Sequence, residues 1–589
     1  MHELHPAIPR QRRRIEEFLQ LNGLRYDDVD YYAVLIDESS DEIIAGGGLK
    51  GGVIKCVAVA DGHKGEAVAN QIVSHLIAKA NAAGHQCVKL YTKPQNRPLF
   101  ESLSFRFLAE APEAILMETG VGGICKYSEE LRVRSKESNC YSSTGKGSAD
   151  AVKWPVGVIV MNCNPFTLGH RYLIERSSEL VERLYVVVVR EDCSMFSYSE
   201  RKAMVSQGVK DLGNVVVVDG SDYAVSATTF PTYFLKRISD ATDTQILLDL
   251  NIYMRHIAPA LGATVRFVGS EPTDPLTRRY NELMRQQLGD DHICEIPRME
   301  MDGNAVSASR VRRAIENNSL WEAIRLVPPP TIPYIIAHLA TRALQAELDT
   351  TPKPGLVDKR DNGAHHDMDH TLMQRSIQAL HPYFVGLAQL GFSSPHPRHD
   401  DIVRIGIEAE HAMFEATGGV NTYKGALFSM GLAVVAVGSA VLCHNPHVIS
   451  SSIAALASEF PATKGTHGSK AKKNVSLKGA LENANDGYQQ LFEAWLPFYE
   501  NCCESGDPYA LHKTLLRIMC DLDDTNIVYR TSLETMLKVK EEAQQLLNAF
   551  SIAALEALNG DFIRRNISPG GSADMLSLVV FLHAVVRKQ

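Results

Sequence analysis

The stretch that decides the fold of the central region is "VGVIVMNCNPFTLGHRYLIERS", residues 156–177. Its first six residues are apolar and rich in Val, which is typical of a buried strand. Pro165 ends the strand, and an amphipathic helix pattern follows. Gly169 and His170 fall in the first helical turn, where unpaired N–H groups and the helix dipole attract anions. Gly169 also lets a phosphate approach the backbone. We therefore predict a phosphate site at this junction.

Further apolar segments place this junction in a parallel sheet. Between 154 and about 325, helical patterns separate four more predicted strands: "RLYVVVVR" (183–190), "NVVVVDG" (214–220), "QILLDL" (245–250) and "TVRFVG" (264–269). Continuous apolar strands that alternate with helices indicate a sheet covered on both faces. In such a doubly wound α/β fold, ligands bind at the carboxyl ends of the strands, where the strand order reverses.

Composition shifts divide the chain into three predicted domains. Residues 1–133 mix short strands with helices, including a helix near 66–83, which predicts an α+β domain. Residues 134–150 are polar and rich in Ser and Gly, so they are predicted to be a linker to the α/β domain at 151–326. "VPPPTIP" (327–333) is predicted to be a stiff spacer. Residues 334–589 show only helical periodicity, which predicts an all-α domain.

Overall composition excludes several classes of function. The 589 residues suggest about three or four domains, and the formal net charge of −9 argues against nucleic-acid or anionic-membrane binding. The apolar stretch 430–443 is shorter than the roughly 18 residues that span a bilayer, so it is expected to be a buried helix. No signal peptide is apparent, and the 11 cysteines form no C-x-x-C pair. We expect free thiols in a reducing cytoplasm.

A second predicted phosphate site follows the α/β strands. "VSASRVR" (306–312) opens another helix with the hydroxyls of Ser307 and Ser309 and the guanidinium of Arg312. Adenylyl transfer breaks ATP between its α and β phosphates, and the enzyme mainly positions groups and neutralises charge. One site for the α phosphate and another for the leaving pyrophosphate would serve that reaction.

The two motifs resemble the paired signatures of the HxGH nucleotidyltransferase superfamily, with Thr167 in the first histidine position. Five segments in order then resemble the citrate lyase ligase family, over about 1–325: 164–175, "SATTFPTYFLK" (226–236), "IAPALGATVRFVGSEP" (257–272), "YNELM" (280–284) and "EIPRMEMDGNAVSASRVR" (295–312). The resemblance implies ATP-dependent activation of acetate and acetylation of the prosthetic-group thiol on the acyl carrier subunit of citrate lyase. AMP and pyrophosphate would be released.

The resemblance also implies roles for individual residues. Thr167 and His170 would contact the phosphates during adenylation, with Mg²⁺ expected on general grounds. Arg201 is either an additional phosphate ligand or a surface helix residue. Ser226 and Thr228 are either pocket residues or helix caps. The remaining predicted ATP-binding residues are Asn164, Pro165, Phe166, Gly169, Gly269, Glu271, Ser307, Ser309 and Arg312.

The first segment resembles the N-acetyltransferase (GNAT) fold that such ligases carry as a leader. "VAVADGHKGEAVANQIVSHLI" (57–77) places a glycine-containing turn between a strand and a helix, where N–H groups could receive a pyrophosphate. Gly62, however, stands where a basic residue is usual. We therefore predict no acetyl-transfer chemistry for this segment.

Four polar stretches interrupt the predicted helices of the last domain: 351–369, 418–431, 521–530 and 567–576. Lysines beside spaced carboxylates are suited to a Mg²⁺-triphosphate, because oxygen ligands hold the cation and ammonium groups offset the remaining charge. "GAHHDMDH" (363–370) also permits a transition metal, or merely solvated and capping roles. Ser572 permits a simple N-cap of the last helix instead of a ligand contact.

These stretches resemble the triphosphoribosyl-dephospho-CoA synthase family over nearly all of 332–589. Such enzymes transfer the triphosphoribosyl part of ATP to 3′-dephospho-CoA and release adenine. The predicted base and Mg²⁺ ligands are Asp367, Asp369 and Asp524, with no assignment between them. The predicted substrate-binding residues are Lys353, Asn421, Lys424, Asn526, Arg530, Ser572 and Asp574.

The sequence departs from the synthase family at three places. Tyr423 replaces a histidine, Thr531 and Ser532 replace two glycines, and Ser469 replaces a glutamate. Two rival functions therefore stay open. One is a nucleotide-cofactor adenylyltransferase, which "RFVGSEP" and the GNAT-like leader disfavour. The other is a ligase whose helical half is degenerate and only docks the carrier.

Overall fold

The computed structural model describes residues 1–63, 66–139, 153–190, 194–223, 241–270, 274–461 and 477–586. Several predictions lie outside these residues: those on Ser226, Thr228, Glu271 and Ser469, on part of the 57–77 turn, and on 140–150 of the linker. The chain forms two compact units, Met1–Val306 and Ser307–Gln589, and each is described by itself.

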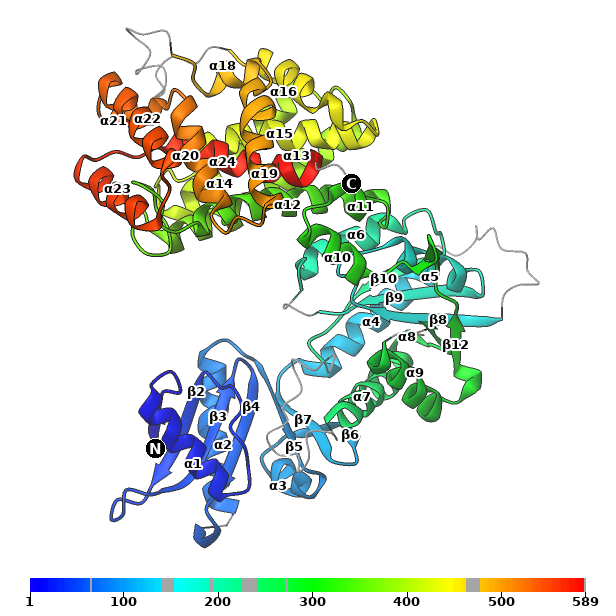
Figure 1. The fold of residues 1–589 in the computed structure, drawn as a ribbon. Helices are drawn as coiled ribbons and strands as arrows, with labels where there is room; N and C mark the ends of the chain where they lie inside the picture. The colour runs from blue at the N-terminus through cyan, green and yellow to red at the C-terminus, as the bar shows by residue number, and fades with distance from the viewer. Residues whose placement is uncertain are drawn as a thin grey trace. The chain divides into compact units, whose positions relative to one another are not determined.

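The first unit contains a seven-stranded sheet, drawn in blue in Figure 1. Its strand order is β1-β2-β3-β4-β5-β7-β6, and only β4 and β5 pair in parallel. The helix α2 (Glu66–Ala82) packs on one face and α1 (Pro9–Leu21) contributes to the core on the other. The strands are β1 His2–Leu4, β2 Tyr31–Ile36, β3 Ile43–Lys50, β4 Val53–Val59, β5 Cys87–Thr92, β6 Arg106–Ala111 and β7 Ala114–Gly120.

The same unit contains a five-stranded, fully parallel sheet in the order β10-β9-β8-β11-β12. Its strands are β8 Trp154–Met161, β9 Val181–Val188, β10 Val215–Asp219, β11 Val265–Gly269 and β12 Ile293–Ile296. On one side of β8 the chain adds β9 and then β10, and on the other side it adds β11 and then β12. The reversal point predicted for an α/β fold therefore lies between β8 and β11.

The helices of the first unit include two corrections to the prediction. "QILLDL" is part of a helix, α7 (Ala241–Ile252), and β12 supplies the fifth strand instead. Residues 134–139 of the predicted linker continue the helix α4 (Gly123–Asn139). The others are α3 Arg97–Ser102, α5 Leu168–Ser178, α6 Tyr198–Gly208, the π-helix η4 Tyr253–Ile257, α8 Ala258–Leu261 and α9 Pro275–Leu288.

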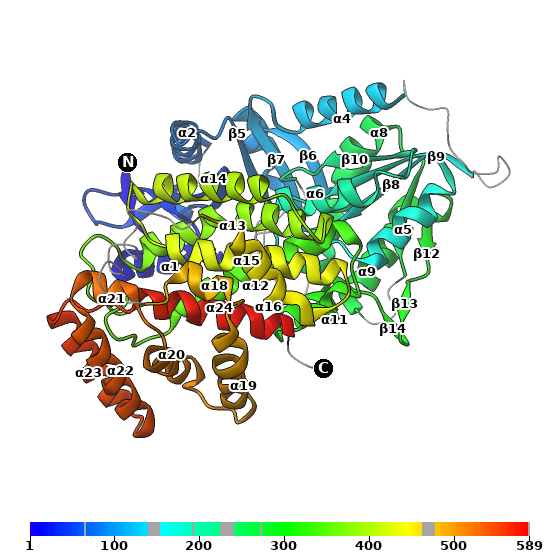
Figure 2. The ribbon, with the colours of Figure 1, turned by 90° about the horizontal axis from the view of Figure 1, so that it is seen from above.

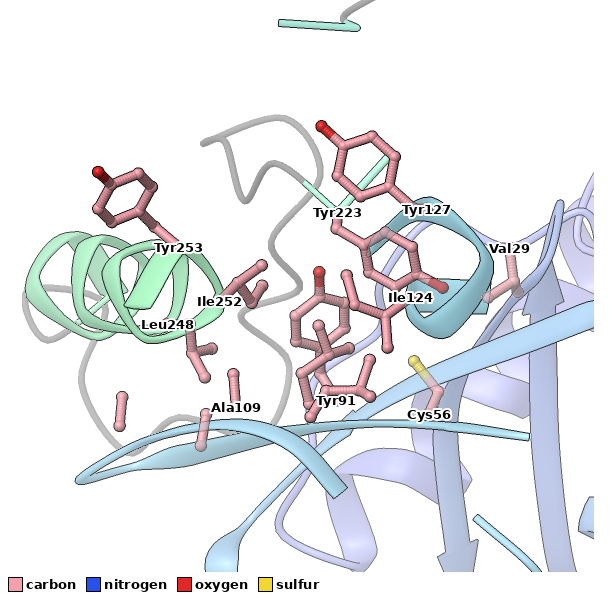
Figure 3. Close-up of a cluster of buried hydrophobic side chains, with 14 of the residues drawn as sticks. Val29, Cys56, Tyr91, Ala109, Ile124, Tyr127, Tyr223, Leu248, Ile252 and Tyr253 are labelled. Atoms are coloured by element: carbon pink, nitrogen blue, oxygen red, sulfur yellow. The ribbon is translucent and has the colours of Figure 1, made fainter. Parts of the chain in front are cut away.

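A shared hydrophobic core joins the two sheets within the first unit. Figure 3 shows Leu248 and Ile252 of α7 near Ala109 of β6, with Tyr127 of α4 and Tyr223 also in the cluster. A buried carboxylate, Glu118 of β7, accepts hydrogen bonds from the Tyr223 hydroxyl and the Ile124 N–H. The first segment is thus packed against the parallel sheet.

The second unit is helical throughout its described part, where no strand is assigned. Its long helices α13, α14 and α15 pack side by side (Figure 2). The helices are α10 Ala308–Glu316, α11 Leu320–Ile324, α12 Ile332–Asp349, α13 His370–Ser393, α14 His399–Thr417, α15 Lys424–Leu442, α16 Ile449–Ser458, α18 Ala480–Asn485, α19 Leu496–Glu504, α20 Ala510–Asp521, α21 Thr525–Arg530, α22 Leu533–Asn548, α23 Ile552–Arg564 and α24 Gly570–Val586.

The division between the units falls at Val306, earlier in the chain than the proline-rich segment 327–333. The reason is that α11 packs against α12 and α24 of the helical unit. By length and composition α15 could cross a membrane, but 83% of its apolar window is buried inside the protein. This burial confirms the prediction of a core helix at 430–443.

Candidate active sites

The first candidate site lies at the carboxyl ends of β8 and β11, on either side of the reversal point. The loop after β8 leads to Thr167, which is the N-cap of α5. Gly269 ends β11, and its carbonyl accepts a hydrogen bond from Asn281 Nδ2 at 3.2 Å. Because parallel strands end at one edge of the sheet, both segments lie at the edge where folds of this type bind ligands.

Thr167 and His170 form a reciprocal cap at the start of α5. The His170 N–H donates to Thr167 Oγ1 at 3.2 Å, and the Thr167 N–H donates to His170 Nδ1 at 3.1 Å. Since Nδ1 accepts, the neutral ring carries its proton on Nε2. Burial, reinforced by the charge of Arg298, lowers the pKa of His170 from 6.5 to about 4. His170 is therefore an uncharged hydrogen-bond donor at neutral pH.

Two neighbours of His170 are fixed by packing. The ring of Phe166 is fully buried and stacks on the His170 imidazole, with 6.1 Å between ring centroids. A Cβ at Gly169 would lie only 2.6 Å from the carbonyl oxygen of Val306. Gly169 is thus required by the close approach of another backbone segment, in addition to any phosphate. Pro165, preceding Phe166, is buried as well.

Arg201 differs from both predictions made for it, which were an additional phosphate ligand and a surface helix residue. Its side chain is completely buried, and its guanidinium donates to the carbonyl oxygens of Phe196, Asn162 and Val189 at 3.2, 2.7 and 2.8 Å. These bonds tie the end of β8 to the end of β9. Asn164 also supports the loop, because its Oδ1 accepts the Phe196 N–H at 3.2 Å. The structure therefore assigns Arg201 a positioning role for the loop.

A basic residue that the sequence analysis did not single out lies near His170. Arg298 follows β12, and its charge acts on both His170 and Asp274. Its backbone N–H donates to Ser270 Oγ at 3.1 Å, which joins the segments after β11 and β12. The available signal was its position directly after a strand at the ligand edge of the sheet.

The predicted second phosphate motif begins the helical unit. Ser307 is the N-cap of α10, where its Oγ accepts the Arg310 N–H at 3.3 Å and lies 3.0 Å from Ser309 Oγ. Arg312 lies in the following turn. Because Ser307 starts the second compact unit, the predicted meeting of Arg312 with His170 stays a prediction.

The second candidate site is centred on the start of α24, within the helical unit. Asp524 is buried and accepts hydrogen bonds from the Gly571 N–H, the Ser572 N–H and Ser572 Oγ at 3.3, 2.8 and 3.0 Å. It also caps α21 through the Asn526 N–H at 3.0 Å. A carboxylate of the protein thus occupies the anion-attracting N-terminus of α24.

A buried ion pair lies beside this helix start. Lys353 is 1% exposed, and its ammonium donates to Glu347 of α12, which is 3% exposed. Asp574 is close to the same carboxylates: burial, then the charges of Asp524 and Glu347, raise its pKa well above the ordinary 3.8. The sequence analysis missed Glu347, because one glutamate in an apolar helix resembles an ordinary surface residue.

The start of α15 reaches the same cluster. A Cβ at Gly425 would lie 2.2 Å from Asp574 Oδ2, so a larger residue there would displace the Asp574 carboxylate. Tyr423 is 4% exposed, and its hydroxyl has no hydrogen-bond partner in the described structure. The negative charges of Glu347 and Asp574 lie close enough to act on the Tyr423 side chain. The Lys424 ammonium instead donates a hydrogen bond to the carboxylate of Glu410. The Lys424 backbone N–H donates to Asn421 Oδ1 at 3.3 Å.

The acidic loop before α13 lies partly at the surface. Asp369 is the N-cap of α13 and accepts the Leu372 N–H at 2.7 Å. Asp367 is exposed, 3.8 Å from His365 Nδ1, and His365 Nε2 lies 2.8 Å from Ser568 Oγ. Arg530 donates to Asn566 Oδ1 at 2.7 Å and to the carbonyl of Ala364. This set connects the 351–369 loop to the segment before α24.

A metal centre of several side chains is not present in the described residues, where no group of three or more His, Cys, Asp or Glu could hold an ion. The predicted trio Asp367, Asp369 and Asp524 is accordingly not gathered into one cluster. Magnesium with a nucleotide commonly has one or two carboxylate ligands and several phosphate or water oxygens.

Comparisons with known proteins match the two parts of the chain to two different families. A model of the citrate lyase ligase C-terminal domain matches residues 156–335, and one of ATP:dephospho-CoA triphosphoribosyl transferase matches 333–589. The [citrate [pro-3S]-lyase] ligase of Haemophilus influenzae is 36% identical over 332 residues, which cover 54% of this chain and 94% of the relative. The ligase of Escherichia coli is 36% identical over 330 residues, 54% of this chain and 89% of the relative.

A different relative matches the second half. The 2-(5''-triphosphoribosyl)-3'-dephosphocoenzyme-A synthase of Escherichia fergusonii is 34% identical over 271 residues, 42% of this chain and 89% of the relative. The chain belongs to the citrate lyase ligase family and to the triphosphoribosyl-dephospho-CoA synthase family. The start of α5 lies in the residues that the ligase model matches, and the start of α24 lies in those that the transferase model matches.

Proposed function

We propose that the protein is a bifunctional enzyme that both makes and acetylates the prosthetic group of citrate lyase. Its ligase part would acetylate the prosthetic-group thiol of the acyl carrier subunit with ATP and acetate. Its synthase part would make 2′-(5″-triphosphoribosyl)-3′-dephospho-CoA from ATP and 3′-dephospho-CoA. The observation that supports the proposal most is the pair of separate anion-handling helix starts, at α5 and α24, each in the part that matches its own family.

In the ligase reaction, an acetate oxygen attacks the α phosphorus of ATP. The bond between the α and β phosphates breaks, pyrophosphate leaves, and acetyl adenylate forms. The N–H groups of the α5 turn and the neutral Nε2–H of His170 donate to the phosphate oxygens while Thr167 orients the imidazole. The carrier thiol then attacks the acetyl carbonyl, AMP leaves, and the thiol proton is released. We propose that Ser307, Ser309 and Arg312 hold the β and γ phosphates.

In the synthase reaction, the ribose 2′-oxygen of 3′-dephospho-CoA bonds to C1 of the ATP ribose. The bond from that carbon to adenine breaks, and the proton lost by the hydroxyl is balanced by one gained by adenine. We propose Asp574 as the general base in place of Asp524. Burial raises the pKa of both carboxyl groups, but that of Asp524 is engaged in capping α24 through the Ser572 N–H and Oγ.

The remaining substrate contacts in the synthase part would come from the loops around α24. Asn526 and Arg530 of α21 and Asn421 and Lys424 near α15 would bind triphosphate or dephospho-CoA. We propose that Lys353 acts through Glu347, since its ammonium is buried against that carboxylate. Magnesium, when bound, would offset the charge of the triphosphate, with Asp367 or Asp369 as a ligand.

The finer structural assignments belong to the same proposal. We infer that residues 1–133 are a GNAT-like domain without acetyl-transfer chemistry, and that 334–589 are an all-α synthase domain. Every cysteine in the described ranges is a free thiol, which supports the predicted cytoplasmic location. Acetate, ATP, 3′-dephospho-CoA and the acyl carrier subunit are the proposed partners, and neither nucleic acid nor membrane is among them.

Product counting tests the proposal. Adenine-labelled ATP is incubated with the protein and either acetate plus deacetylated carrier or 3′-dephospho-CoA alone. We expect labelled AMP in the first reaction and free labelled adenine in the second. Failure to form AMP would contradict the ligase assignment. Failure to release adenine, with AMP still formed, would favour a degenerate helical half that only docks the carrier.

A further inference from the structure

Three helices of the second unit meet beside the proposed general base. The helix α15 packs against both α12 and α24, and the three lie together in Figure 2. The buried Glu347 belongs to α12, Asp574 belongs to α24, and Tyr423 directly precedes α15. The start of α15 lies against α24, because a Cβ at Gly425 would be 2.2 Å from Asp574 Oδ2. Tyr423 is therefore held beside these two carboxyl groups.

The hydroxyl of Tyr423 is a buried polar group that no described residue uses. The side chain is 4% exposed, and its hydroxyl has no hydrogen-bond partner in the part of the chain that the structure describes. Its backbone is fixed, since its carbonyl accepts the Leu427 N–H at 2.7 Å. A tyrosine hydroxyl can donate one hydrogen bond and accept another, and leaving it buried without either is costly. The position therefore favours a ligand that brings a hydroxyl of its own.

The charge around this hydroxyl favours a neutral ligand group. Asp524 and Glu347 are buried, and their charges act on Asp574, which is only half-buried. The Lys353 ammonium is paired with Glu347. A phosphate group placed here would bring further negative charge to these carboxyl groups, which is unfavourable in a buried site, whereas a hydroxyl would not. The cluster therefore suits a sugar hydroxyl and disfavours a phosphate.

Space for a substrate lies next to the cluster. A cavity of about 370 Å³ has Tyr488, Trp495 and Met575 in its wall, and Met575 follows Asp574 in α24. Tyr488 is itself buried, and both Ser429 and the charge of Asp574 act on its hydroxyl. Small-molecule sites commonly have volumes of about 300–1,000 Å³ and aromatic walls. The cluster thus borders a space of the size that a nucleoside needs.

We propose that the Tyr423 hydroxyl binds the 3′-hydroxyl of 3′-dephospho-CoA and thereby selects the acceptor. In the proposed synthase reaction the attacking 2′-hydroxyl meets Asp574, and the 3′-hydroxyl is on the neighbouring carbon of the same ribose. An acceptor with a phosphate on that oxygen is excluded, because the phosphate would lie among the carboxyl groups. This inference rests on the proposed synthase function and on Asp574 as its base.

Adenine release with two acceptors tests the proposal. One is 3′-dephospho-CoA, and the other is an analogue that has hydrogen in place of the 3′-hydroxyl and keeps the 2′-hydroxyl. In the wild type the analogue should have a kcat/KM about 10- to 100-fold lower, the effect of leaving a buried hydroxyl unpaired. Tyr423→Phe should lower kcat/KM for 3′-dephospho-CoA by a similar factor, and it should use the two acceptors about equally.

A matched control separates this contact from the general loss of a buried hydroxyl. Tyr499→Phe changes another buried tyrosine of the same unit, whose ring packs edge-on against His583, and it should discriminate as the wild type does. If the analogue is disfavoured by the same factor in Tyr423→Phe and in the wild type, the proposal is overturned. Absence of adenine release by the wild type from 3′-dephospho-CoA would instead overturn the proposed synthase function, and this inference with it.

The wild type alone decides the matter if Tyr423→Phe does not fold. CoA, which carries the 3′-phosphate, should inhibit adenine release only at concentrations about 100-fold or more above the KM for 3′-dephospho-CoA, because binding would bring like charges together. The analogue without the 3′-hydroxyl should stay the poorer acceptor. Inhibition by CoA near the KM for 3′-dephospho-CoA, or an equal kcat/KM for the two acceptors, contradicts the proposal.

Discussion

The starts of α5 and α24 present the same backbone donors but use them differently. At α5 the cap is an uncharged pair, Thr167 and His170, and no carboxylate of the protein is bonded to the turn in the described structure. At α24 the donors are already taken by Asp524. A helix N-terminus can therefore receive a substrate phosphate in one site and organise the protein's own carboxylates in the other.

This difference has an electrostatic consequence. Burial lowers the pKa of His170 and raises the pKa of Asp574, so it favours the neutral form of each group. His170 then acts as a donor over a wide pH range, whereas Asp574 must lose a proton before it can act as a base. We therefore expect each active-site substitution to lower the rate of its own reaction only. We also expect the rates of the two reactions to fall differently as the pH is lowered.

The largest expected effect concerns the α24 site. Asp574→Asn should lower the rate of adenine release about 10²- to 10⁴-fold, the usual contribution of a general base. Adenine release from ATP and 3′-dephospho-CoA measures it. Asp400→Asn, at an exposed position on α14, is the control and should keep the wild-type rate. Near-normal release in Asp574→Asn would assign the base elsewhere.

The α5 site should be nearly as sensitive. His170→Ala removes one donor to the developing phosphate charge, which typically costs about 10²- to 10³-fold in rate. Acetate-dependent pyrophosphate exchange measures it. His292→Ala, at an exposed histidine of the same unit, should exchange normally. If both variants lose activity equally, the effect does not come from the α5 turn.

The buried pair Lys353–Glu347 should matter for stability of the helical unit. Lys353→Met leaves a buried carboxylate without its partner and should lower the free energy of unfolding by about 3–5 kcal/mol. Replacing both residues, Lys353→Met with Glu347→Leu, should restore most of that loss. Denaturant unfolding measures both variants. A single variant as stable as the wild type would show that the pair is not buried together.

The smallest expected effect is on the pH profiles. Between pH 6.5 and 4, folded His170 binds fewer protons than the unfolded chain, so its neutral state contributes stability above pH 6.5 that declines as the pH falls toward 4. The rate of acetate-dependent pyrophosphate exchange should accordingly show no loss centred at pH 6.5. Adenine release should decline at a higher pH than an ordinary carboxylate would give, because the pKa of Asp574 is raised. Coincident acidic limbs in the two profiles would contradict this account.

Local sequence chemistry predicted the strand β8 and the helix start at α5, because these residues are contiguous, whereas the phosphate contacts there stay a prediction. "QILLDL" was wrong as a strand since its leucines favour a helix once α7 can pack on β6. Leucine-rich segments of this length are ambiguous without their tertiary neighbours.

Side-chain roles that depend on distant partners could not be predicted. Arg201 resembled a ligand or a surface residue, yet three separate carbonyl groups surround it. Asp524 looked like a metal ligand, but a helix that starts almost fifty residues later uses it as a cap. The buried partnership of Glu347 with Lys353 likewise forms only when a loop folds back on α12.

The most direct test of two independent sites counts both products in both variants. Labelled ATP is supplied to His170→Ala and to Asp574→Asn with each acceptor in turn, and AMP and adenine are separated. We predict that His170→Ala loses AMP formation and keeps adenine release, and that Asp574→Asn does the reverse. Loss of both products in either folded variant would contradict the account.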